Sequence, residues 1–134
     1  MKRICLLFLT AVLLGLLGCA APTPQEIASA DYGAYPTNYQ EVIKSYLGAI
    51  LKDPSSAEYN FLAPPKTGWT TYGGGKKFGY VVCAKINSKN SFGGYVGFQP
   101  YYFMIKNGSV ITSILGSTDP ISQGLANGAC KGFI

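Results

Sequence analysis

Hydrophobic residues recur every three or four positions between residues 39 and 52, which predicts an amphipathic helix. The apolar positions are Val42, Ile43, Tyr46, Leu47, Ile50 and Leu51. Most of the intervening positions are polar, so one face of the helix should pack against the rest of the protein. Thr37 and Gln40 have the spacing of a capping box at its start. Asp53-Pro54 should end it, because a residue before proline is pushed out of the helical region.

From residue 58 the pattern changes to short aromatic and β-branched runs separated by glycine, which predicts strands. The runs span residues 58–62, 69–72, 78–86, 95–98, 101–106 and 109–115. Asn107-Gly108 between the last two is the signature of a type I′ hairpin, so these strands should be antiparallel. Pro100 cannot donate a ladder hydrogen bond, which predicts a bulge, a sheet edge or a strand break. We expect an α+β fold with one N-terminal amphipathic helix packed on a small antiparallel sheet.

The first residues show a third pattern, a basic start followed by a continuous apolar run. Met1-Lys2-Arg3 precedes residues 4–17, in which Thr10 is the only strongly polar residue. This is the arrangement of an export signal. The apolar run has about 14 residues, whereas a membrane-spanning helix needs roughly 20. Residues 1–18 are therefore expected to direct export rather than to span a membrane permanently.

Leu16-Leu17-Gly18-Cys19 resembles the lipobox of bacterial lipoproteins. The resemblance implies cleavage before Cys19, a diacylglyceryl group on its thiol and a membrane anchor of two or three acyl chains, which would be stable. Ala20 stands where an Asp would favour retention at the inner membrane, so the resemblance implies a lipid anchor in the outer membrane, facing the periplasm or the cell surface. The alternatives are an ordinary secretory signal or an uncleaved anchor, with Cys19 unmodified.

Without residues 1–18 the chain has 116 residues, enough for one small domain. It then has nine lysines, no arginine and six acidic residues, a formal net charge of +3. Scattered lysines without arginine argue against a nucleic-acid partner. Residues 20–36 contain three prolines and no sustained period, which predicts a flexible linker. The expected organisation is a signal at 1–18, a lipidated N-terminus and linker at 19–36, and a small α+β domain at 37–134.

Cysteine usage predicts a single disulfide. Cys5 lies in the signal and Cys19 would carry lipid, which leaves Cys83 and Cys130. Outside the cytoplasm two remaining thiols in a small domain usually pair. The alternative is a free reactive thiol at Cys130, which lies between two nearby glycines.

The segment 87–97, with the sequence NSKNSFGGYVG, is dense in amides, hydroxyls and glycines. Together with LKDPSSA at 51–57, it resembles a family of small exported bacterial and phage-associated proteins with a DPSSA-like segment and an NAKNSFGGY-like loop. The resemblance covers about residues 39–115, supports the fold and implies no activity. One interpretation is a structured turn held by its asparagines and glycines. The other is an exposed loop that binds protein or glycan through Lys89, Asn90, Ser91 and Tyr95.

The residue inventory argues against catalysis. The chain has no histidine, which excludes histidine-based triads and zinc-histidine sites. Glu58 and Asp119 are the only loosely plausible carboxylate pair, and their spacing does not support glycosidic chemistry. The Gly-rich segment 72–77 lacks the spacing of a phosphate-binding loop. We therefore expect no catalytic residue, metal or cofactor, and a non-enzymatic envelope lipoprotein that binds a protein or glycan. The alternative is a small periplasmic inhibitor of a cell-wall-degrading enzyme, suggested by size, export and the disulfide.

Overall fold

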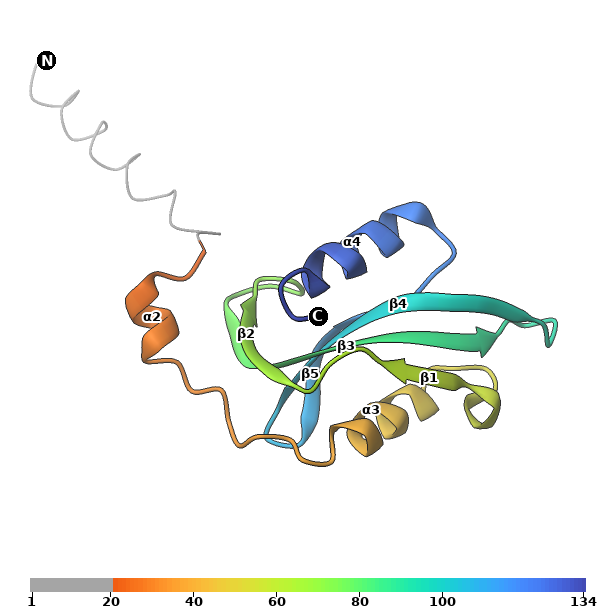
Figure 1. Ribbon diagram of the computed structural model, residues 1–134, viewed down its shortest axis with the longest axis horizontal. Coiled ribbons are helices and arrows are strands. Elements are labelled where there is room, and N and C mark those ends of the chain that lie inside the picture. The colour runs from red at the N-terminus through yellow and green to blue at the C-terminus, as the bar shows by residue number, and fades with distance from the viewer. Residues whose placement is uncertain (1–20) are drawn as a thin grey trace, which may run out of the picture.

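The computed structural model describes residues 21–134. The elements in chain order are the helices α2 (Pro24–Ala28) and α3 (Tyr39–Gly48), the 3₁₀ helix η1 (Pro54–Ser56), the strands β1 (Glu58–Phe61), β2 (Lys66–Thr70), β3 (Lys77–Lys89), β4 (Tyr95–Lys106) and β5 (Ser109–Ile114), and the helix α4 (Pro120–Cys130). This part of the chain has the predicted α+β fold, with a five-stranded antiparallel sheet and one disulfide. The helices α3 and α4 lie on opposite faces of the sheet (Figure 1).

Strand β3 lies at the centre of the sheet and has neighbours along both edges. One edge pairs with β4, and the other pairs with β2 at residues 77–81 and with β1 at residues 84–87. The strands β4 and β5 form the predicted hairpin. Its turn residues Asn107 and Gly108 have φ angles of 50° and 74°, which confirms the type I′ geometry because both central residues of that turn need positive φ.

The predicted strands 95–98 and 101–106 are one continuous strand, so Pro100 does not break it. Pro100 lies opposite Lys85 of β3. On its other side, β5 pairs with β4 only from Tyr102 onward. Pro100 therefore occupies a stretch where β4 is an edge strand, which suits a residue with no N–H to donate.

Burial on both faces of the sheet explains the uninterrupted apolar runs in β3 and β4. Alternate side chains of a strand point to opposite faces. One face packs against Ile43 and Leu47 of α3, both fully buried. The other packs against Ala126 and Cys130 of α4. The sheet residues of the first layer are Val82, Ala84, Ile86, Tyr101, Phe103 and Ile105, and those of the second are Val81, Cys83, Tyr102, Met104 and Ile114.

Helix α3 lies within the range of the periodic apolar pattern, but the predicted capping box at Thr37 and Gln40 is absent from it. The N-cap residue is Asn38, and its side chain makes no capping bond. A preceding turn, in which the N–H of Tyr39 donates to the carbonyl of Pro36, shifts the helix start by one residue. The helix also ends earlier than expected, at Gly48.

Helix α4 was not predicted, and it corrects the expectation of a single helix. The carboxylate of Asp119 accepts the backbone N–H of Ser122 at 2.8 Å, and Pro120 occupies the first helical position. Both are standard start signals. Gly124 and Gly128 interrupt the apolar period inside the helix, which hides it from pattern analysis.

The segment expected to be a linker contains regular structure and contacts the domain, so that expectation needs correction. Residues 24–28 form α2. This helix begins with a capping box of its own, formed by Thr23 and Glu26. Tyr32 packs edge-on against Phe78 of β3. These contacts join residues far apart in sequence, which a local pattern does not reveal. Cys19, the predicted lipid site, lies outside the described residues.

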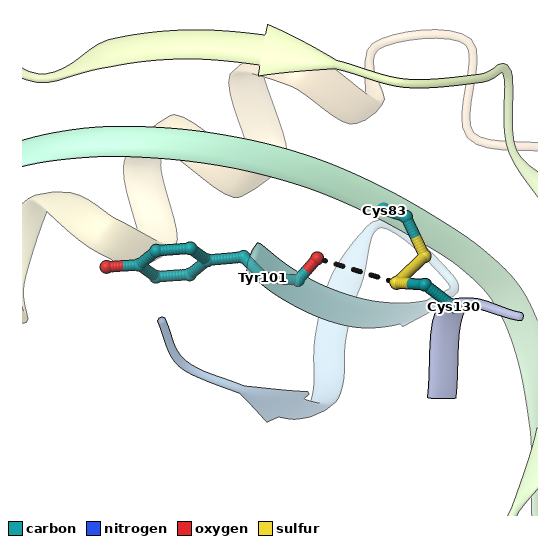
Figure 2. The surroundings of a disulfide bond; sticks show 3 residues. All are labelled: Cys83, Tyr101 and Cys130. Carbon is teal, nitrogen blue, oxygen red and sulfur yellow. Dashed lines mark hydrogen bonds between the residues drawn. A yellow bond between two sulfur atoms is a disulfide. The ribbon is translucent and has the colours of Figure 1, made fainter. Parts of the chain in front are cut away.

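The predicted disulfide between Cys83 and Cys130 is confirmed. It joins the middle of β3 to the last residue of α4 (Figure 2). The two Cα atoms are 5.9 Å apart and both residues are buried. Cys130 Sγ lies 3.8 Å from the carbonyl oxygen of Tyr101, a packing contact because an oxidised sulfur has no hydrogen to donate. The disulfide fastens α4 to the sheet.

Candidate functional site

The loop between β3 and β4 lies at the far end of the longest hairpin of the sheet (Figure 1). The pairing of β1 with β3 ends at Asn87, and that of β5 with β4 is confined to residues 102–106. Residues 88–97 therefore extend beyond the neighbouring strands of the sheet. We call residues 87–97 the hairpin tip.

The side chain of Asn90 organises the turn of the hairpin tip. Its Oδ1 atom accepts the backbone N–H groups of Phe92 and Gly94 at 3.0 and 3.1 Å. Its own backbone N–H donates to the carbonyl of Gly94 at 2.8 Å. Gly93 has φ +82°, a conformation that L side chains rarely adopt. These contacts are those of the structured-turn interpretation.

A bulge next to this turn is held in the same manner by a second asparagine. The β3–β4 register shifts between Asn87 and Lys89, and Gly97 on the opposite strand has φ +87°. Asn87 Oδ1 accepts the N–H of Gly97 at 2.9 Å, while its Nδ2 donates to Glu58 at 2.8 Å. A bulge of this kind redirects the end of a hairpin.

The hairpin tip is also fastened to η1, so residues 51–57 and 87–97 lie in contact. Lys89 Nζ lies 3.2 Å from Asp53 Oδ2 and 5.4 Å from the centre of the Tyr95 ring. The hydroxyl of Tyr95 donates to the carbonyl of Ser56 at 2.8 Å. The hydroxyl of Ser55, and then Lys89, hold the pKa of Asp53 below its usual value.

These contacts divide the predicted loop residues by role. Lys89, Asn90 and Tyr95 all make bonds within the chain, whereas Ser91 is exposed beside Phe92. Phe92 was not among the predicted residues, yet 97% of its surface is exposed. The available signal was a large apolar residue in the middle of a polar, Gly-rich loop. Its isolation from any apolar period is typical of a residue with no place in the core.

The two carboxylates considered for catalysis have structural roles. Glu58 accepts the amide of Asn87, and Asp119 caps α4. Residues 21–134 contain no group of three or more His, Cys, Asp or Glu side chains that could hold a metal ion. Both carboxylates therefore hold neighbouring parts of the fold.

A surface groove of about 440 Å³ lies between α3 and the turn of the β4–β5 hairpin. Its walls are Asn38, Glu41, Val42, Ser45, Tyr46, Gly108, Ser109 and Val110. The Tyr46 hydroxyl is already bonded to Ser113 at 2.9 Å. Most of the polar groups lining the groove are exposed to solvent, so it lacks the buried, convergent polar groups of a typical ligand site.

Comparisons with protein-family models, with curated proteins and with solved structures found no match to this chain. Within residues 21–134 none of the helices has the length and apolar character needed to cross a bilayer.

Proposed function

We propose that this chain is an exported bacterial lipoprotein, held on the outer membrane by lipid on Cys19, with a non-enzymatic domain that binds an envelope protein or glycan. The lipobox-like Leu16-Leu17-Gly18-Cys19 supports the anchor, and Ala20 supports the outer membrane. The disulfide supports export, because disulfides persist mainly in oxidising compartments.

Fatty-acid labelling tests the anchor. Cells grown with a clickable palmitate analogue should label the wild-type protein and leave Cys19→Ala unlabelled. Cys5→Ala is the matched control, because Cys5 lies in the segment that would be removed. A wild-type protein without label, or equal label on Cys19→Ala, would overturn the lipid anchor.

The single observation that carries the binding role is the exposure of Phe92 on an ordered hairpin tip. Burying a phenylalanine side chain stabilises a complex by about 1.5–3 kcal/mol relative to leaving it in water. The bonds of Asn90 already hold the turn, so little conformational entropy is lost on binding. A protein with an apolar pocket fits this surface best, because aromatic anchors in pockets dominate protein interfaces.

Site-specific photocrosslinking in cells tests this role. A benzoyl-phenylalanine at position 92 should crosslink to a specific envelope protein. The same residue at Ile121, which is 74% exposed on α4, should not. Phe92→Ser should abolish capture at an unchanged melting temperature. Equal products from both positions would contradict the proposal, and Phe92-dependent retention on purified peptidoglycan would identify a glycan instead.

The second candidate is an inhibitor of a cell-wall-degrading enzyme, favoured by the projection of residues 88–97 beyond the rest of the sheet. A rigid hairpin of this shape could enter an active-site cleft. The purified protein would then slow peptidoglycan hydrolysis by lysozyme or by a periplasmic wall hydrolase. Phe92→Ala would raise the inhibition constant at least tenfold. Unchanged hydrolysis at saturating protein would eliminate this candidate.

A further inference from the structure

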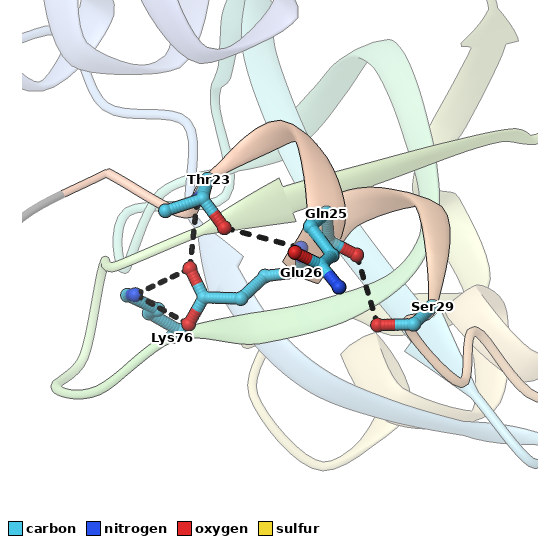
Figure 3. Close-up of polar contacts among 5 residues, drawn as sticks. All are labelled: Thr23, Gln25, Glu26, Ser29 and Lys76. Carbon is cyan, nitrogen blue, oxygen red and sulfur yellow. Dashed lines mark hydrogen bonds and ion pairs between the residues drawn. The ribbon is translucent and has the colours of Figure 1, made fainter.

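Residues 22–36 lie along the domain rather than away from it, and we call them the strap. At its beginning, Glu26 accepts the backbone N–H of Thr23 at 2.7 Å and the ammonium of Lys76 at 2.8 and 2.9 Å (Figure 3). Thr23 Oγ1 accepts the N–H of Glu26 in return. Lys76 lies in the turn between β2 and β3, so the strap begins against that turn.

The rest of the strap crosses the same end of the sheet. Tyr32 and Tyr35 pack edge-on against Phe78 and Tyr80, at centroid distances of 5.9 and 5.4 Å. Asp31 lies 3.0 Å from Lys106 at the end of β4. All these partners lie in the first residues of β3 or the last residue of β4. In the antiparallel pairing of these strands, that end is opposite the hairpin tip.

Gly33 marks a close approach between the strap and the β4–β5 turn. Its φ is +78°, and a Cβ added there would lie 2.5 Å from Asn107 Oδ1. Only glycine combines this backbone conformation with this spacing. The strap therefore fits the sheet at a position that a single methyl group would disturb.

The strap limits how far the domain can lie from a lipid on Cys19. Pro22 is buried, and only Ala20 and Ala21 separate it from Cys19. Three extended residues span at most about 11 Å. A free chain through residue 36 could instead reach about 55–60 Å.

We propose that the strap seats the β2–β3 end of the domain on the phospholipid surface and directs the hairpin tip away from it. This inference rests on the proposed anchor at Cys19. The end near the strap presents Trp69 and Tyr72, which are 38% and 45% exposed. Both are residue types favoured at membrane–water interfaces. Strand β3 has 13 residues and spans about 40 Å, so Phe92 faces a partner in the aqueous space.

Energy transfer to dansyl-labelled phospholipid tests this orientation. The full lipoprotein, with Trp69 as its single tryptophan, is reconstituted into phosphatidylethanolamine and phosphatidylglycerol vesicles. Transfer should be several-fold stronger from Trp69 than from the indole of a Trp69→Phe, Phe92→Trp variant. Equal transfer from the two positions in protein that floats with the vesicles would overturn the orientation and leave the anchor standing. Protein that carries no acyl group and does not float would overturn both.

Release of the strap supplies the second test. Gly33→Ala should lower transfer from Trp69 several-fold, because the freed chain lets the domain move away from the bilayer. Gly93→Ala is the matched control, since Gly93 also has positive φ but has open space around its added Cβ. Lys76→Ala, which removes one ion pair and leaves the core intact, should lower transfer to a smaller extent. Transfer unaffected by both strap variants would contradict the proposal.

Discussion

Asn90 Oδ1 accepts the backbone N–H of Phe92 at 3.0 Å, so the side chain that organises the turn also holds the backbone of a phenylalanine that is 97% exposed. This bond links the residue that holds the turn to the residue that is exposed on it. The asparagine makes the contacts of a structured turn, while the phenylalanine has no contact that would explain its type. Asn90 thus holds the turn, and the binding role that we propose falls on Phe92, two residues further along the chain.

Replacement of Asn90 should affect both properties. Asn90→Ala removes the acceptor of two backbone N–H groups and should lower the free energy of unfolding by about 1 kcal/mol. Partner capture through Phe92 should weaken as well, because the turn loses its order. Asn90→Asp keeps an acceptor at this position and should retain most of both. Thermal unfolding and capture of the crosslinked partner measure the two effects, and capture unaffected by Asn90→Ala would show that turn order is irrelevant.

Removal of the disulfide should destabilise the domain strongly. The bond closes a loop with a sequence separation of 47, for which the chain-entropy model gives about 4 kcal/mol as an upper value. The double variant Cys83→Ala, Cys130→Ala should unfold at much lower urea concentration than the oxidised wild type. Reduced wild type should match the variant. Equal stability of oxidised and reduced protein would contradict this prediction.

Two glycines should respond to alanine in opposite directions. A Cβ on Gly116 would overlap the ring of Tyr101, which is buried and stacked on Phe103 at 5.9 Å. Gly116→Ala should therefore lower the free energy of unfolding by about 1–3 kcal/mol. Gly128, on the exposed side of α4, has open space around the added Cβ. Gly128→Ala should stabilise the protein by about 0.5–1 kcal/mol, and urea titration compares the two variants.

The strap should loosen in acid. The ammonium of Lys76, and then the N–H of Thr23, lower the pKa of Glu26 from its ordinary value of 4.5. A carboxylate with a lowered pKa stabilises the folded state fully above its ordinary value, and this contribution is lost as pH falls through the folded pKa. The contacts of Glu26 should thus persist at neutral pH and weaken as pH falls below its ordinary pKa of 4.5. Carboxyl chemical shifts measure the titration, and Lys76→Ala should return the pKa of Glu26 toward 4.5; an identical titration in this variant would exclude the ion pair as the cause.

Alkaline unfolding should depend on Tyr102. Burial raises its pKa from 10.0 to about 12. The folded state favours the neutral phenol. Its contribution to the stability of the folded state is therefore complete below pH 10 and is lost as pH rises through about 12. Tyrosinate absorbance should show a group titrating near pH 12 that Tyr102→Phe removes. A wild-type titration curve unchanged by the substitution would refute this assignment.

The predictable part of the fold depends on short-range chemistry. Asn107-Gly108 predicted its own turn because few residue pairs tolerate positive φ at both positions. The strand runs predicted the sheet because β-branched and aromatic residues suit a pleated, buried surface. In contrast, α4 was missed because Gly124 and Gly128 interrupt its apolar period, although Asp119-Pro120 carried a start signal.

The sequence predicted the region of the candidate site but not the role of each residue in it. The loop at 87–97 was selected for its composition, but the division of roles within it was not visible. Tyr95 bonds to Ser56, which is 39 residues away in the chain. Contacts between residues so far apart in the sequence depend on how the sheet brings η1 and the hairpin tip together.

The sequence by itself determined the elements and chemistry that depend on neighbouring residues: the type I′ hairpin, the α+β class and the two cysteines available to pair. It is also the whole basis of the proposed export signal. The tertiary structure alone decided that the predicted linker is a strap, since Asp31 meets Lys106 across 75 residues. It also decided that Phe92 is exposed while Tyr102 and Phe103 are buried. Local patterns fix backbone conformation, whereas burial and long-range pairing depend on the packing of the whole chain.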